Sequence, residues 1–258
     1  MTRSLQRSTG HLADHRRLIV THAAAAALAG LVPIPYVDEQ LPALIRRALI
    51  RRLARERHVD LDEDAVREIA DGRVPPPGWR SLIGLAPLAR SVRRSIRAAF
   101  LAFGVYRRAE AASRTFALGT LFDHYCARHH VGIGLDARAA RALRERIDRT
   151  LAAPGGRLGG FAFRRGFQAA LRATVRAPLE LVSALTWGKL RRLRGKPRDE
   201  VEAEEVVETT IDASLAREGS FLGRAVRGVE RQLAALGGGW VDGLVARFDG
   251  GPGEDGHA

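Results

Sequence analysis

The chain has 258 residues, 46% of them hydrophobic, so it can bury a sizeable core and is too apolar for wholesale disorder. Its single cysteine excludes an internal disulfide and a cysteine-cluster zinc site. Residues 1–198 carry 37 basic and 16 acidic side chains, a net charge of +21, whereas residues 199–258 carry 5 basic and 13 acidic ones, a net charge of −8. This asymmetry indicates an anionic partner, either lipid or nucleic acid, or an acidic end that folds back on the basic body.

The hydrophobic periodicity is helical along the whole chain and strand-like alternation is absent, which predicts an all-α protein. We expect an irregular bundle of roughly seven to nine helices without a sheet. A basic, Ala/Arg-rich helical domain is expected over residues 1–196, an acidic linker over 197–210, C-terminal helices packing on the body over 211–249 and a disordered tail over 250–258.

The first helix is expected over residues 11–31, with an alanine-rich centre where helix propensity is highest. Pro33 and Pro35 force a bend, and Asp38 can cap a second helix that ends near residue 57. Residues 18–37 lack charge and are long enough to span a bilayer, but alanine and proline make insertion weak. A buried helix of a bundle is the favoured interpretation; an interfacial hairpin bent at the prolines and a transmembrane helix are the alternatives.

The turn between these two helices carries a further pattern. An alanine-rich helix runs into the segment LVPIPYVD at residues 31–38, which contains Pro33, Pro35 and Asp38, and then into an apolar and basic helix. Over about residues 20–57 this arrangement resembles the EcsC-like proteins and the helical domain attached to some small bacterial GTPases. The resemblance implies membrane association and no established activity.

A short helix capped by Asp62 is expected next, followed after a proline-rich loop by a basic amphipathic helix over residues 85–103. One face of that helix is apolar, and the opposite face is rich in arginine. This pattern is typical of a helix lying on an anionic lipid surface, and its alternative is a core-facing helix with solvated arginines. The candidate contact residues are Arg90, Arg93, Arg94 and Arg97 for headgroups and Phe100 and Phe103 for insertion.

A separate helix is expected over residues 109–130, and Asp136 can cap the one after it. Asp123, Cys126 and His130 share one face of the first of these helices, with His124 beside them, and all are side chains able to bind metal. One helix face rarely supplies a whole site, so the metal interpretation is weak. The favoured interpretation is a core cysteine with histidines near a helix C-terminus.

The last part of the chain has three expected helical stretches: an apolar one over residues 163–193 that Pro178 kinks or splits, one over 211–236, and a short amphipathic piece over 240–248.

On the helix expected over residues 11–31, His11, His15 and His22 share a face but lack the glutamate of a zinc-protease motif. We expect these histidines to be structural.

Taken together, these patterns favour a non-enzymatic bacterial protein of the cytoplasm, attached peripherally to the anionic face of the inner membrane, with no cofactor and no indicated protein partner. One alternative is a nucleic-acid-associated protein that uses the same arginines. The other is a metal-dependent enzyme centred on residues 123–130.

Overall fold

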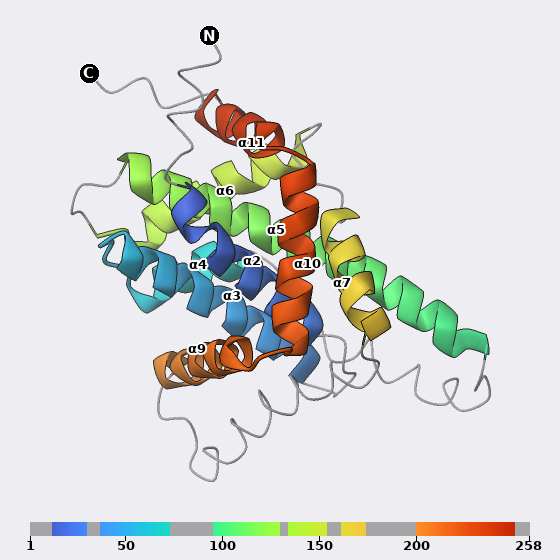
Figure 1. Ribbon diagram of the computed structural model, residues 1–258. Helices are drawn as coiled ribbons and strands as arrows, with labels where there is room; N and C mark the ends of the chain where they lie inside the picture. The colour runs from blue at the N-terminus through green and yellow to red at the C-terminus, as the bar shows by residue number, and fades with distance from the viewer. Residues whose placement is uncertain are drawn as a thin grey trace.

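The computed structural model describes residues 12–29, 37–72, 95–129, 134–153, 161–173 and 200–250. These residues form nine α-helices and no strand, apart from one isolated bridge between Leu61 and Leu135 (Figure 1). The predicted all-α class is therefore confirmed for the described part of the chain. Within that part, no helix has both the length and the hydropathy needed to cross a membrane.

Helix α2 (Leu12–Ala29) lies at the centre of the bundle, against α3, α5 and α10. Residues 23–28 of this helix are almost completely buried. Small alanine side chains let the neighbours approach closely: a Cβ added at Gly119 of α5 would lie 2.9 Å from Cγ2 of Ile19. The favoured sequence interpretation of α2, a buried helix of a bundle, agrees with this packing. Pro33 and Pro35 lie outside the described residues.

Helix α3 (Val37–Glu56) packs on α2, and α4 (Glu63–Asp71) and α6 (Ala137–Ala152) pack on each other. Both predicted caps are present: the side chain of Asp62 accepts a hydrogen bond from the backbone of Ala65, and Asp136 does the same for Ala139. Asp38 lies in the first turn of α3, and its side chain is outside the described residues.

Helix α5 (Ser95–His129) corrects a sequence prediction, because it is one continuous helix of 35 residues where two helices were expected. The expected break fell after residue 103, next to Gly104. A single glycine inside a helix costs only about 1 kcal/mol relative to alanine, and α5 gains far more from packing on α2, α3 and α7. Arg90, Arg93 and Arg94 lie outside the described residues, as do the side chains of Arg97, Phe100 and Phe103.

The C-terminal third corrects two further boundaries. The predicted acidic linker is helical from residue 200, as part of α9 (Glu200–Ala216). The helix expected over 211–236 is split between α9 and α10 (Phe221–Ala235), because Gly219 adopts φ 70° and Ser220 caps α10. Helix α11 (Gly239–Gly250) then crosses the end of the bundle (Figure 1). Of the expected disordered tail, residues 250–258, Gly250 is the last residue of α11, and residues 251–258 lie outside the described residues.

Helix α7 (Phe161–Ala173) packs along α10. Their closest approach is at Gly166, where an added Cβ would lie 2.7 Å from the backbone nitrogen of Val229. Gly228 lies at the same crossing, and a Cβ added to Gly228 would lie 3.1 Å from the backbone of Gly166. Only glycine fits at such a distance, so these two residues fix α7 against α10.

Candidate functional site

A buried polar cluster is centred on the carboxylate of Asp123 in α5, which is completely buried. It accepts a hydrogen bond from Nδ1 of His15 in α2, at 2.8 Å. It also accepts two from Arg57, which follows α3: one from Nε at 2.7 Å and one from Nη2 at 3.1 Å. The hydrogen bond to Asp123 is the largest cause that raises the pKa of Arg57. This cluster therefore connects α2, α5 and the end of α3 through a buried ion pair between Asp123 and Arg57.

Cys126 lies one turn after Asp123, and both are buried, as their shared face predicted. Burial raises the pKa of the Cys126 thiol to about 12, and the negative charge of Asp123 adds to the effect. The reactive and metal-binding form of cysteine is the thiolate. At neutral pH this side chain is therefore a buried, protonated thiol.

The side chain of His124 contacts α11, whereas that of Asp123 contacts α2 and the end of α3. Its Nε2 lies 3.0 Å from Oδ1 of Asp249 in α11, and Arg128 forms an ion pair with the same carboxylate. The imidazole ring also meets Phe248 edge-on, with 6.2 Å between the ring centroids. This second network ties α5 to α11.

The predicted cluster therefore divides into two structural networks. No three His, Cys, Asp or Glu side chains gather into a metal-binding group within the described ranges, and His130 lies outside them. His15 and Arg57, the partners of Asp123, are 108 and 66 residues away in the sequence, and no local signal pointed to either. The geometry gives the metal-dependent enzyme no support.

The arginines of α3 are held by a second, larger set of contacts. Arg46 and Arg47 both bind Asp71 of α4. The other three arginines bind the acidic helix α9, which carries no basic residue. The pairs are Arg51–Glu204 at 2.7 Å, Arg52–Glu208 at 3.1 Å, Arg52–Asp212 at 3.2 Å and Arg55–Glu208 at 2.7 Å. One sequence interpretation, an acidic end folded back on the basic body, is thus correct for these two helices.

His22 is completely buried in α2 and is influenced by the charges of Arg52, Glu208 and Asp212, which belong to the α3–α9 contact. Its Nδ1 donates to the carbonyl oxygen of Leu18 at 3.0 Å, and Nε2 has no hydrogen-bond partner. Burial is the main cause that lowers the pKa of His22. The His22 imidazole is therefore held in its neutral form beneath α3 and α9.

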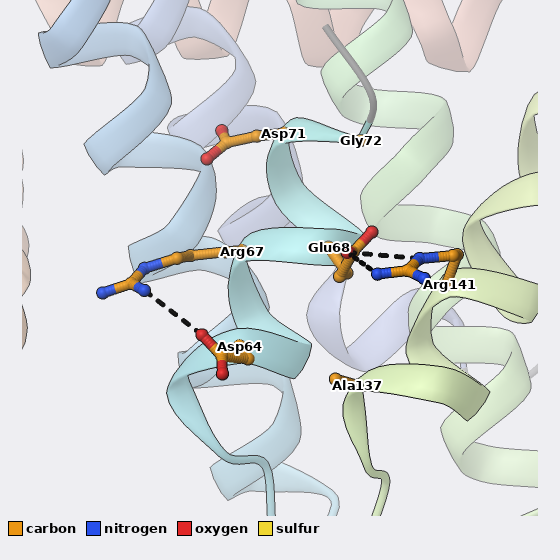
Figure 2. Close-up of a pocket in the computed structure, with 7 residues that line it drawn as sticks. All are labelled: Asp64, Arg67, Glu68, Asp71, Gly72, Ala137 and Arg141. Atoms are coloured by element: carbon orange, nitrogen blue, oxygen red, sulfur yellow. Dashed lines mark hydrogen bonds and ion pairs between the residues drawn. The ribbon is translucent and has the colours of Figure 1, made fainter. Parts of the chain in front are cut away.

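A polar hollow of about 390 Å³ lies between α4 and α6. Figure 2 shows its lining: Glu68 accepts from Arg141 across the hollow, and Arg67 reaches back to Asp64 on the same helix. Asp71, at the rim, is bound to arginines of α3. Every charged side chain that lines the hollow already has an ion-pair partner, so the hollow offers no unpaired charge with which to recognise a ligand.

A different kind of basic group occurs at the start of α7. The guanidinium carbons of Arg165 and Arg164 lie 4.3 and 6.0 Å from the centroid of the Phe161 ring. Both arginines are exposed, and neither forms an ion pair with another described residue. Stacking of a guanidinium on an aromatic face leaves its charge and its N–H donors available. Arg164 and Arg165 are thus a basic pair, stacked on an aromatic ring, that has no acidic partner among the described residues.

Comparisons with known proteins add no functional assignment: no family model, no curated protein and no solved structure matches this chain.

Proposed function

We propose that this protein is a non-enzymatic helical protein that attaches peripherally to an anionic membrane surface, the cytoplasmic face of the bacterial inner membrane, through basic amphipathic segments. Basic residues near an anionic surface each contribute about 1 kcal/mol of attraction. The resemblance of residues 20–57 to membrane-associated helical domains points the same way.

The position of the first turns of α5 carries this proposal. The predicted lipid-binding helix over residues 85–103 runs into α5, and the backbone of α5 projects past α7, out of the bundle at the lower right of Figure 1. The segment that forms the first turns of α5 therefore extends beyond α7 (Figure 1). Its sequence supplies Arg97, Phe100 and Phe103 there, and Arg90, Arg93 and Arg94 just before.

The distribution of charge supports the same conclusion. The five arginines of α3 face four carboxylates, those of Asp71, Glu204, Glu208 and Asp212, so this helix contributes little to an attraction for anions. The basic excess is concentrated elsewhere in the sequence: residues 73–94 contain five arginines and no acidic residue, and residues 174–199 contain seven basic and two acidic residues. Both segments lie outside the described residues.

The test is sedimentation of the full chain with vesicles of neutral phospholipid alone or mixed with phosphatidylglycerol, after nuclease treatment. We expect binding only to the anionic vesicles, and release at high salt because screening weakens surface attraction. The variant Arg90→Glu, Arg93→Glu, Arg94→Glu, Arg97→Glu should bind at least about 100-fold more weakly. A matched control reverses four exposed arginines elsewhere and should lose much less: Arg138→Glu, Arg149→Glu, Arg217→Glu and Arg227→Glu.

Absence of binding to anionic vesicles at low salt would overturn the proposal. Titration with duplex DNA and single-stranded RNA separates it from its alternative: salt-sensitive nucleic-acid binding that requires the same four arginines, without vesicle binding, would favour a nucleic-acid-associated protein.

A further inference from the structure

Two large apolar side chains are exposed in the described part of the chain: Phe161, at 43%, and Leu236, at 49%. Single exposed apolar residues are ordinary on protein surfaces. Their positions are informative here, since Phe161 begins α7 and Leu236 directly follows α10.

The packing of α7 and α10 brings these two residues to one end of the bundle. The helices run antiparallel and cross at Gly166 and Gly228, so the start of α7 lies at the same end as the close of α10 (Figure 1). Aromatic contacts support this placement independently. Phe116 of α5 meets Phe163 at 5.8 Å and Trp240 at 6.2 Å between ring centroids, and these residues lie within a few positions of Phe161 and Leu236.

The start of α7 also carries two basic side chains. Arg164 and Arg165 lie over the exposed ring of Phe161 and have no acidic partner among the described residues. The start of α7, with an exposed ring and two arginines, thus lies at the same end of the bundle as Leu236 and the half-buried Trp240 (Figure 1). Aromatic rings and arginine are enriched where proteins meet the headgroup region of a bilayer, because one part of the side chain is apolar and the other polar.

We propose that this end surface, formed by Phe161, Arg164, Arg165, Leu236 and Trp240, is a docking site for an anionic phospholipid bilayer. Phe161 and Leu236 enter the boundary between headgroups and acyl chains, and the two guanidinium groups bind lipid phosphates. The inference rests on the proposed function and adds a second contact, made by residues whose side chains the structure describes and separate from the first turns of α5.

Size and charge favour a bilayer over a protein as the occupant. A stable protein interface buries about 800 Å² on each partner and involves about 20–30 residues a side. Two exposed apolar side chains fall far short of that. A bilayer needs only a shallow apolar insertion when charge attraction adds to it, as unneutralised arginines beside the ring provide.

Trp240 is a natural reporter for the experiment. The full chain carrying Trp79→Phe and Trp187→Phe keeps Trp240 as its only tryptophan. We expect anionic vesicles made with brominated acyl chains to quench Trp240 emission strongly, and neutral vesicles to leave it unchanged. In the same background, Phe161→Ser with Leu236→Ser should weaken partitioning into anionic vesicles by about tenfold, because both side chains lose their apolar insertion.

A charge variant tests the same surface without removing apolar groups. Arg164→Glu with Arg165→Glu should weaken binding more than the control pair Arg138→Glu with Arg149→Glu, which are exposed on α6. All four side chains are exposed, and unchanged thermal melting would show that each variant folds.

The outcomes distinguish the two proposals. If anionic vesicles bind the chain but do not quench Trp240, and the serine variant binds as well as the parent, the end surface is not the contact and the proposed function stands. If anionic vesicles do not bind the chain at all, both proposals fail. If Phe161→Ser with Leu236→Ser abolishes self-association in sedimentation velocity and leaves vesicle binding unchanged, the surface receives a second copy of the chain, and bilayer docking is wrong.

Discussion

Helix α3 and the start of α7 are both rich in arginine, but their guanidinium groups have opposite surroundings. All five arginines of α3 have an acidic partner, on α4 or on α9. Arg164 and Arg165 of α7 have an aromatic ring instead and no acidic partner among the described residues. The number of arginines in a helix therefore says little about its affinity for anions, because acids from distant parts of the chain decide which charges remain available.

The largest effect that we predict concerns Asp123, which binds Arg57 just after α3 and His15 in α2. Asp123→Asn removes the buried charge and leaves Arg57 without its counterion. We expect the free energy of unfolding to fall by about 3–5 kcal/mol, measured by urea denaturation. Asp148→Asn is the matched control, because Asp148 is exposed and pairs with Arg144 one turn away, and it should cost less than about 1 kcal/mol.

If Asp123→Asn lowers the free energy of unfolding as little as its control does, the buried ion pair of Asp123 does not stabilise the packing of α2, α3 and α5. Asp123→Asn would also distinguish α3 from the start of α7. Amide hydrogen exchange should become faster in α2, α3 and α5, and should increase less at the start of α7.

The second prediction concerns His22, whose pKa is lowered by burial beneath the α3–α9 contact. In the unfolded chain its pKa is near 6.5, so above that pH neither state binds the proton. As pH falls below 6.5 the unfolded state is protonated first, so stability is lost, by at most about 1.4 kcal/mol per pH unit for this one group. The loss ends once pH passes below the lowered pKa of the folded state.

His22→Leu should remove this contribution, since the two proteins share every other titratable group. The measurement is urea denaturation of the two proteins between pH 7.5 and about 4.5, the interval below the ordinary pKa of histidine. Identical pH dependence in both would show that His22 finds a partner or water when protonated. A smaller slope in the variant, with hydrogen exchange in α9 that no longer rises on acidification, would confirm that the buried imidazole ties the α3–α9 contact to pH.

Local sequence signals were enough to predict much of the fold. The 3.6-residue periodicity predicted the all-α class, and side-chain oxygens at Asp62 and Asp136 predicted where α4 and α6 begin. Such features depend on residues within one or two turns. One error lies where tertiary packing outweighs local preference, since α5 continues through Gly104; the other is a misread local signal, because the glutamates and alanines of α9 are themselves good helix formers.

The site was less predictable for the same reason. The shared face of Asp123 and Cys126 followed from helical spacing, and both are buried. Their meaning depended on partners that no local pattern could identify, since His15 and Arg57 reach Asp123 only after α2 and α3 have packed on α5. A motif of potential metal ligands thus became a structural ion pair once its long-range partners were known.

The smallest predicted effect tests the difference between α3 and α7 most directly. Arg165→Ala should change the free energy of unfolding by no more than about 1 kcal/mol, because an exposed guanidinium on an aromatic ring contributes little to stability. Arg51→Ala is its counterpart in α3, and it should cost clearly more because it leaves the buried carboxylate of Glu204 without its ion-pair partner Arg51. Urea denaturation of both variants gives the two values. Equal losses would mean that Arg165 stabilises the fold as much as Arg51 does; a much smaller loss for Arg165→Ala would show that the fold does not depend on its guanidinium group.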